Sequence, residues 1–161
     1  MVPIIMPKQT IELDIIDKKL IGQLASDARI SVTELSRRVG LSKTPVQARL
    51  KRLEECGVIR GYRAMLDPVR LGLDHVAFVE VKLNDTREKA LTAFNEAAIS
   101  VLEIEECHMI AGAFDYLLKV RTQDMMRYRE VLGEQISSLP HVAHTSTHVA
   151  MQAVKDSGIV S

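Results

Sequence analysis

The sequence predicts an α+β protein in which a helix-turn-helix unit precedes a ferredoxin-like βαββαβ unit. Three observations predict this fold class: closely spaced helix start and stop signals near position 40, an alternating apolar segment at 75–83, and a strand–helix–strand–strand–helix–strand order from there on. The 161 residues are 47% hydrophobic and 26% charged, which is ordinary for a globular protein.

Charge divides the chain into the same two parts. Residues 1–65 contain twelve lysines and arginines against seven acidic residues, so this part carries +5 and the remainder −5 in a chain that is neutral overall. A basic module beside an acidic one predicts that the first faces a polyanion. We expect an N-terminal arm at 1–12, a helix-turn-helix domain at 13–60, a hinge strand and linker at 61–74, a ferredoxin-like domain at 75–154 and a tail at 155–161.

The basic part opens with two predicted helices. Apolar residues at helical spacing predict a first helix over 14–26, with Asp14 and Asp17 in its first turn, where carboxylates suit the helix dipole. Ser31 and Glu34 have the spacing of a capping box, which predicts the start of a second helix.

A tight turn is expected between the second helix and a third. Gly40 ends the second helix because glycine accepts the left-handed conformation of a helix end. Ser42 is placed to cap the third helix, and Pro45 falls in its first turn, where the missing N–H costs nothing.

The third helix has one apolar and one polar face. At about 100° per residue, Val46, Leu50 and Leu53 face the core. The opposite face suits groove reading, because glutamine can hydrogen-bond adenine, alanine or a threonine methyl can touch the thymine methyl, and lysine can reach guanine or phosphate. Neighbouring arginines and helix N–H groups suit backbone phosphates. The predicted DNA-binding residues are Arg37, Arg38, Ser42, Lys43, Thr44, Gln47, Ala48, Lys51 and Arg52.

A solvated basic helix in a generic helical bundle is the alternative interpretation of this region. The tight turn, the basic excess and the polar outward face agree with one another, and together they favour DNA binding.

The acidic part alternates strands and helices. After a strand-like segment at 59–66, we expect a strand at 75–83, a helix at 87–98, strands at 101–111 and 114–120 joined by a Gly112-Ala113 hairpin turn, a helix at 124–139 and a strand at 144–153. This order leaves one sheet face without helices. A second copy of the protein is the simplest cover for apolar residues there.

No catalytic or metal-binding constellation is expected. His141, His144 and His148 are close in sequence, but on a strand the last two lie about 13 Å apart, too far to share a metal. Cys56 and Cys107 are expected to be buried thiols. Carboxylate pairs, phosphate loops and nucleophile triads do not stand out, so we expect a non-enzyme without cofactor.

The chain is expected to be cytoplasmic and associated with the nucleoid, with no membrane partner. No apolar run approaches the roughly 20 residues that span a bilayer, and the first residues lack the basic segment of a secretory signal. Met1 and Met6 both remain open as the start.

A series of motifs covers nearly the whole chain, from about Leu13 to Val154. They are Leu13-Asp-x-x-Asp17, Asp27-Ala-Arg-Ile-Ser31, Glu34-Leu-Ser-x-Arg-Val-Gly-Leu-Ser42, Thr44-Pro45, Arg52-Leu-Glu54, Gly57-x-Ile-x-Gly-Tyr62, Glu106-Cys-His108 and Gly112-Ala-Phe-Asp-Tyr116. In these motifs the chain resembles the leucine-responsive regulatory protein (Lrp)/AsnC family of bacterial and archaeal transcription regulators, most of all its leucine-responsive branch.

The resemblance implies a winged-helix-like DNA-binding domain and a ferredoxin-like domain that pairs copies into dimers, often assembled to octamers. It also implies an amino-acid effector, held in a cleft between adjacent dimers by backbone groups and Asp115. The implied effector-binding residues are Gly112, Ala113, Phe114, Asp115, Tyr116, Met125, His148, Val149 and Ala150. Ala113 stands where a second acidic residue is common, and Ala28 where glycine is common.

We therefore expect a sequence-specific regulator that binds double-stranded DNA, copies of itself and an amino acid. Leucine is the first expectation for the effector, and another branched-chain or cyclic amino acid such as proline stays open. The rival interpretations are an architectural DNA-binding protein without effector and, with less support, a small enzyme of amino-acid metabolism.

Overall fold

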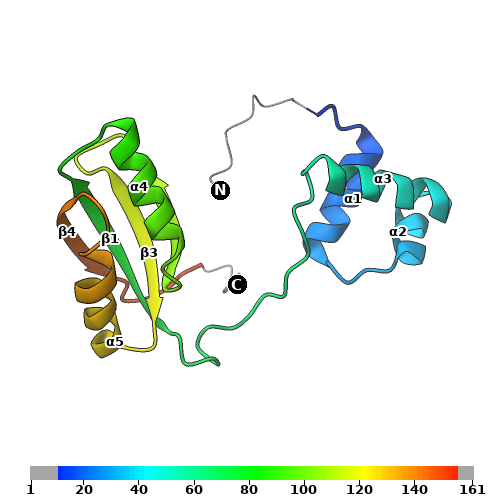
Figure 1. Cartoon of the computed structure of the whole chain (residues 1–161). Helices are drawn as coiled ribbons and strands as arrows, with labels where there is room; N and C mark the ends of the chain where they lie inside the picture. Colours follow the sequence, from blue (N-terminus) through cyan, green and yellow to red (C-terminus); the bar gives the residue numbers. More distant parts are fainter. Residues whose placement is uncertain (1–10, 156–161) are drawn as a thin grey trace. The chain divides into compact units, whose positions relative to one another are not determined.

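The computed structural model describes residues 11–155, which belong to two compact units (Figure 1). In the sequence, the boundary between the units falls between Ala64 and Met65. This division lies within the expected linker at 61–74. The expected arm and tail, and the question of the start at Met1 or Met6, fall almost entirely outside the described residues. Each unit is described by itself.

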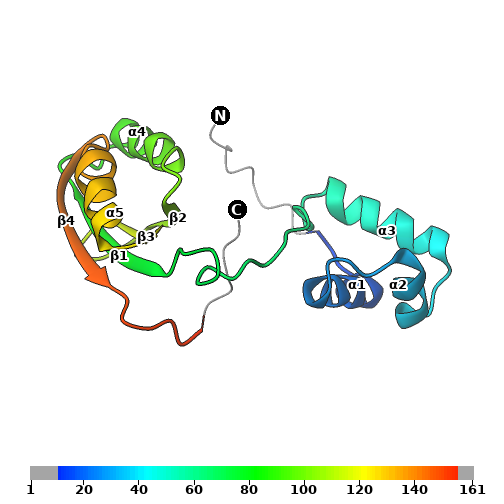
Figure 2. The same cartoon turned by 90° about the horizontal axis from the view of Figure 1, so that it is seen from below.

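The described residues of the first unit, 11–64, form three short helices (Figures 1 and 2). They are α1 (Ile15–Ser26), α2 (Val32–Val39) and α3 (Lys43–Glu55). A small apolar core joins them, formed by the buried side chains of Leu20, Leu35, Val39 and Val46. The pair α2–α3 is the helix-turn-helix that the sequence predicts.

Capping residues determine where α1 and α2 begin and where α2 ends. Asp14 caps α1, and Ser31 caps α2 by accepting a hydrogen bond from the Glu34 N–H at 3.2 Å. The Glu34 carboxylate forms ion pairs with arginines of its own helix, so only half of the predicted capping box forms. Gly40 ends α2 at φ 72°, the left-handed conformation predicted for it.

The start of α3 and the segment after it differ from the prediction. Ser42 occupies the cap position of α3, but its side chain makes no capping hydrogen bond. The strand expected at 59–66 does not form, and only Leu66 makes an isolated bridge. A strand needs an extended partner, and the described part of the first unit contains helices only. Gly61, at φ 149°, interrupts the segment further.

The second unit is a four-stranded antiparallel sheet with helices on one face, as Figure 2 shows. The elements are β1 (His75–Leu83), α4 (Glu88–Ile99), β2 (Ile104–Met109), β3 (Tyr116–Thr122), α5 (Met125–Glu130), a π-helical turn η1 (Val131–Ile136) and β4 (Val142–Val149). The sheet order is β2-β3-β1-β4. This topology confirms the ferredoxin-like prediction.

The core of the second unit lies between the sheet and its helices. Alternate β1 residues face the helices, and Val79 pairs with Leu118 of β3 across the sheet. Phe94 of α4 packs on Tyr116, with ring centroids 4.3 Å apart. Buried side chains of both helices complete a core much larger than that of the first unit.

Two connections depart from the sequence-based expectation. The segment 110–115 joins β2 to β3, in place of a two-residue turn at Gly112-Ala113. It is closed at its base, because the Ile110 N–H donates to the Asp115 carbonyl at 2.8 Å and the Asp115 N–H donates to the Val81 carbonyl at 2.9 Å. The helix expected at 124–139 is divided between α5 and η1.

The sheet face opposite the helices is mixed in character, whereas the sequence suggested an apolar surface. Phe78 of β1 is 38% exposed there. Its neighbours are charged: Lys119 lies 3.2 Å from Glu105, and Arg121 also pairs with Glu105. Polar side chains therefore occupy much of this open face.

Candidate DNA-binding and effector-binding sites

The predicted DNA-binding residues all lie at the surface of the first unit. Val46 and Leu53 are fully buried on the inner face of α3, and Leu50 is half-buried. All nine predicted residues on α2, the turn and α3 are exposed: Arg37, Arg38, Ser42, Lys43, Thr44, Gln47, Ala48, Lys51 and Arg52. The helical projection thus separated the inner from the outer face.

The two arginines of α2 are paired within their own helix. Glu34 accepts hydrogen bonds from Arg37 at 2.6 and 2.9 Å and from Arg38 at 2.8 Å. The guanidinium of Arg37, then that of Arg38, lowers the pKa of Glu34 to about 2. Arg38 also donates to the Gln23 side chain at 2.6 Å. A phosphate that contacts either arginine would have to compete with Glu34 or use the guanidinium N–H groups that Glu34 leaves unused.

Arg52 takes part in an interaction that the sequence interpretation missed. It donates a hydrogen bond to the carboxylate of Asp17, which is 1% exposed. Arg49, absent from the predicted site, binds Asp17 at 2.8 Å and Asp14 at 2.6 Å. The one sequence feature that could have indicated this network is that Asp14 and Asp17, at the start of α1, and Arg49 and Arg52, on α3, are each three residues apart. It is weak, because such pairs are common on exposed helix faces.

The implied effector residues divide between two ends of the sheet. Tyr116, which follows the 110–115 loop, pairs with Val81 near the end of β1. Val149 pairs with Ala77 near the start of β1. The end of β3 lies beside this start of β1, and Met125 comes three residues after β3. About 13 Å of strand separates the two pairing positions. Within one copy these residues therefore lie near opposite ends of β1.

Asp115 is bound within its own unit. Its carboxylate accepts the Leu83 N–H at 2.8 Å and pairs with Lys82 at 3.1 Å. The Leu83 N–H, followed by Lys82, lowers the pKa of Asp115. The carboxylate thereby fixes the 110–115 loop to the end of β1.

Other implied effector residues differ in exposure. Tyr116 is buried in the core against Phe94, and burial raises the pKa of its phenol. Gly112 and Ala113 are exposed at the loop tip, and Phe114 is half-buried. Met125, His148 and Val149 are exposed, whereas Ala150 is half-buried and donates its N–H to the Val76 carbonyl.

The cysteines and histidines do not form a metal site in the described residues. No group of three or more His, Cys, Asp or Glu with metal-binding geometry occurs among residues 11–155. Cys107 is exposed and Cys56 is half-buried, so the expectation that both are buried was wrong. Cys107 lies on the edge strand β2, where a neighbouring strand covers one side only.

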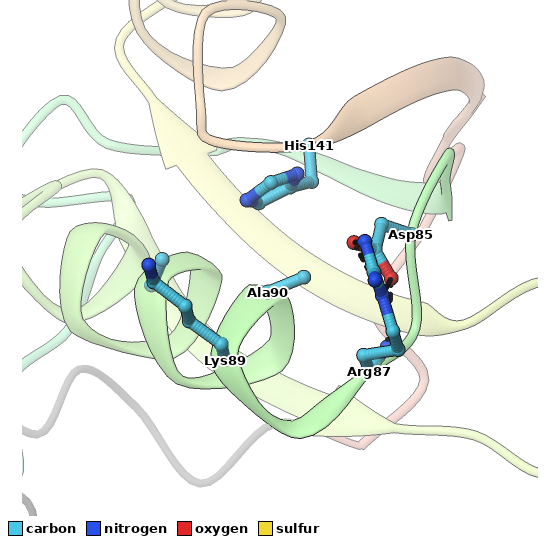
Figure 3. Close-up of a pocket in the computed structure, with 6 residues that line it drawn as sticks. Asp85, Arg87, Lys89, Ala90 and His141 are labelled. Atoms are coloured by element: carbon cyan, nitrogen blue, oxygen red, sulfur yellow. Dashed lines mark hydrogen bonds and ion pairs between the residues drawn. The ribbon is translucent and has the colours of Figure 1, made fainter.

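Two cavities on the second unit are lined by residues other than the implied effector residues. Figure 3 shows the first cavity, beside the start of α4. Its volume is about 470 Å³, and Arg87 at its edge pairs with Asp85 at 2.7 Å. A second, of about 280 Å³, lies along α5 and η1. The larger one is lined by Asp85, Arg87, Lys89, Ala90, Ala93 and His141. Neither contains a residue of the implied site.

The helices within residues 11–155 are all too short or too polar to cross a bilayer.

Comparison with known proteins identifies both units. Residues 13–60 match a winged helix-turn-helix DNA-binding model, and residues 76–160 match the Lrp/AsnC ligand binding domain. The chain is 63% identical over 151 residues to the proline dehydrogenase transcriptional activator of Rhizobium radiobacter, covering 94% of this chain and 97% of that protein.

More distant relatives agree. The leucine-responsive regulatory protein of Escherichia coli (strain K12) is 47% identical over 146 residues, covering 91% of this chain and 89% of that protein. A transcriptional regulator of Neisseria meningitidis, solved as its L-Met complex, superposes with a TM-score of 0.83 at 30% identity, covering 90% and 94% of the two chains. These relatives are regulators and not enzymes. The chain belongs to the Lrp/AsnC family of DNA-binding transcriptional regulators.

Proposed function

We propose that this protein is a proline-responsive regulator that activates transcription of a proline dehydrogenase gene. The observation that carries the proposal is the similarity to a proline dehydrogenase activator, 63% identical over nearly the full length of both chains. Identity to the leucine-responsive protein is lower, at 47% over a similar length. Proline therefore takes the place of leucine as the first candidate effector.

The DNA-reading surface in this proposal is the exposed face of α3. Thr44, Gln47, Ala48 and Lys51 offer the side-chain types that recognise base edges in the major groove. Ser42, Lys43, Arg37 and Arg38 surround them with donors for backbone phosphates. The lack of a capping hydrogen bond from Ser42 supports this role, because its hydroxyl and the first N–H groups of α3 stay available to an anion.

The effector site in this proposal is composite and lies between copies of the protein. One copy offers the 110–115 loop at one end of its sheet, and another offers the region of Met125 and 148–150 from the opposite end of its own. The separation of these segments within a single copy supports such an arrangement. Amino-acid binding would then be linked to assembly, because ligand that binds only the assembled form stabilises it.

Self-association is the third part of the proposal. The open sheet face, with Phe78 among ion pairs, would pair two copies, and dimers would assemble further, up to octamers. Paired recognition helices would read two half-sites about one helical turn apart. A regulator of this kind acts in the cytoplasm on nucleoid DNA.

The decisive experiment combines calorimetry and DNA binding with the full chain. We expect heat of binding for L-proline, less for L-leucine and L-methionine, and selective binding to the DNA upstream of the proline dehydrogenase gene. L-Proline should change the affinity for that DNA or the sedimentation coefficient of the protein. No heat for any amino acid, with DNA binding intact, would favour the architectural alternative.

The role of Asp115 in effector binding requires a matched pair of variants. Lys82→Met removes only the ion pair of the loop, whereas Asp115→Asn also alters the carboxylate itself. Weaker proline binding in both variants would indicate that the loop position matters. Weaker binding in Asp115→Asn alone would indicate direct contact with the ammonium group.

A further inference from the structure

We propose that Asp17 is a positioning residue for DNA recognition, which fixes α3 against α1 through Arg49 and Arg52. Neither arginine is then a DNA contact, although Arg52 lies at the edge of the recognition face. The inference rests on the DNA-binding function of the first unit. It concerns how that unit holds its reading surface, in addition to which residues form it.

The carboxylate of Asp17 is fully engaged. One oxygen accepts from Arg49 at 2.8 Å, and the other accepts from Arg52 and from the Asp14 N–H at 3.1 Å. Asp17 is 1% exposed, and an ionised carboxylate at such a position requires partners of this kind. Three donors on two helices therefore meet at a single buried side chain.

Asp14 closes the network from the first turn of α1. One of its oxygens accepts the Asp17 N–H at 2.8 Å and the other accepts from Arg49 at 2.6 Å. The same two aspartates form the reciprocal cap of α1. The start of α1 and the middle of α3 are consequently held by one set of charge-assisted hydrogen bonds.

Two attachment points one turn apart restrain α3 in rotation as well as in distance. Arg49 and Arg52 are three residues apart and reach the same carboxylate, so rotation of α3 about its axis breaks at least one bond. A side-chain tip lies about 6 Å from a helix axis, so a 20° rotation displaces it by about 2 Å. That displacement exceeds what a base-edge hydrogen bond tolerates.

Apolar packing holds α3 near its two ends. Val46 and Leu53 are fully buried, whereas Leu50 between them is only half-buried. The ionic network acts in this middle part of the helix, through Arg49 and Arg52. Burial opposes the ionised form of Asp17, but the bonds from Arg52 and Arg49 outweigh this effect and lower its pKa to about 2.

The test measures specificity with the full chain, on two DNAs of equal length. The first is the genomic fragment that the wild-type protein binds most tightly, and the second is of random sequence. Wild-type preference for the first tests DNA reading itself, independently of Asp17. The variants are Asp17→Asn, Arg52→Gln and the double variant, with Asp27→Asn as a control at the exposed end of α1.

For Asp17→Asn we expect affinity for the specific fragment to fall about tenfold or more, the equivalent of one lost base contact. Affinity for random DNA should stay the same or rise, because two arginines are released. Arg52→Gln should lower the affinity for the specific fragment and leave the salt slope unchanged. The affinity of the double variant for this fragment should be no lower than that of either single variant. Asp27→Asn should resemble the wild type.

The opposite results would overturn the proposal. If Arg52→Gln weakens binding to both DNAs equally and flattens the salt slope by about 0.9, Arg52 is a phosphate contact. Unchanged specificity in Asp17→Asn would also exclude the positioning role. All affinities are compared at temperatures where circular dichroism shows a folded chain. If Asp17→Asn does not fold, Arg49→Gln and Arg52→Gln provide the same test.

Discussion

The helix-turn-helix unit and the ferredoxin-like unit carry their functional surfaces in different ways. In the first, all proposed DNA-contacting residues lie on two adjacent helices of one chain and the turn between them. In the second, the implied effector residues lie at opposite ends of one sheet. A local surface is complete as soon as its unit folds, whereas the divided surface would be completed only by the assembly of copies that we propose.

The same two units also differ in what holds them together. The second has a continuous apolar core between sheet and helices, whereas the first combines a few buried aliphatic side chains with the network around Asp17. Apolar packing contains no titratable or charged group, so it is insensitive to pH and to the screening of charges by salt. An ionic network responds to both, so the two units should respond differently to solution conditions.

The largest effect is expected from removing core volume in the second unit. Leu118→Ala deletes a fully buried side chain of β3, and we expect a loss of roughly 2–5 kcal/mol in the free energy of unfolding. Leu102→Ala, at a position 94% exposed, makes the same chemical change and serves as the control. Urea denaturation of the full chain measures both. Equal losses would contradict the assignment of the core.

An intermediate effect is expected from Asp17→Asn in the first unit, roughly 1.5–3 kcal/mol for charge-assisted hydrogen bonds. The pKa of Asp17 is lowered from 3.8 to about 2, so its contribution is complete above about pH 4 and is lost as the pH falls toward 2. The difference in urea midpoint between wild type and variant should therefore shrink over that range. A pH-independent difference would show that charge is not the cause.

Gln47→Ala tests whether the local surface of the first unit reads sequence. If Gln47 hydrogen-bonds adenine, its loss should reduce discrimination at one base pair by roughly 1–3 kcal/mol. Competition binding with single-base variants of the preferred fragment measures this. An equal loss on preferred and random DNA would leave Gln47 without a reading role.

The smallest effect is expected for Arg37→Ala at the edge of that surface. A phosphate contact contributes about 0.9 to the salt slope, and the negative charge of Glu34, which pairs with Arg37, weakens the attraction of Arg37 for a phosphate. Affinity for all sequences should fall modestly and the slope should flatten. Lys18→Ala removes an equal charge from the exposed side of α1 and should leave the slope unchanged.

The fold of both units follows from short-range patterns in the sequence. Some features depend only on neighbouring residues, and the structure agrees with their prediction. They are the helix end at Gly40, the strand at 75–83 and the helix starts at Asp14 and Ser31. The strand expected at 59–66 was wrong, because forming a strand depends on a partner elsewhere in the chain. Local pattern does not reveal whether that partner exists.

The sites show the same division. Periodicity alone separated the exposed from the buried face of α3, since one helix contains all the needed information. The partners of Arg52 and Asp115 lie more than thirty residues away, on other elements. No spacing rule connects such pairs, so only the structure shows that these charges are engaged.

The missing strand between the units has a consequence for how this chain can change in evolution. A one-residue insertion in β1 would turn every following side chain to the other face of the sheet. Near Gly61 no ladder register exists, so residues can be gained or lost there without that penalty. Variation in length at this place would change how far the recognition helix can reach from the ferredoxin-like unit. In the dimer that we propose, it would adapt one regulator to differently spaced operator half-sites.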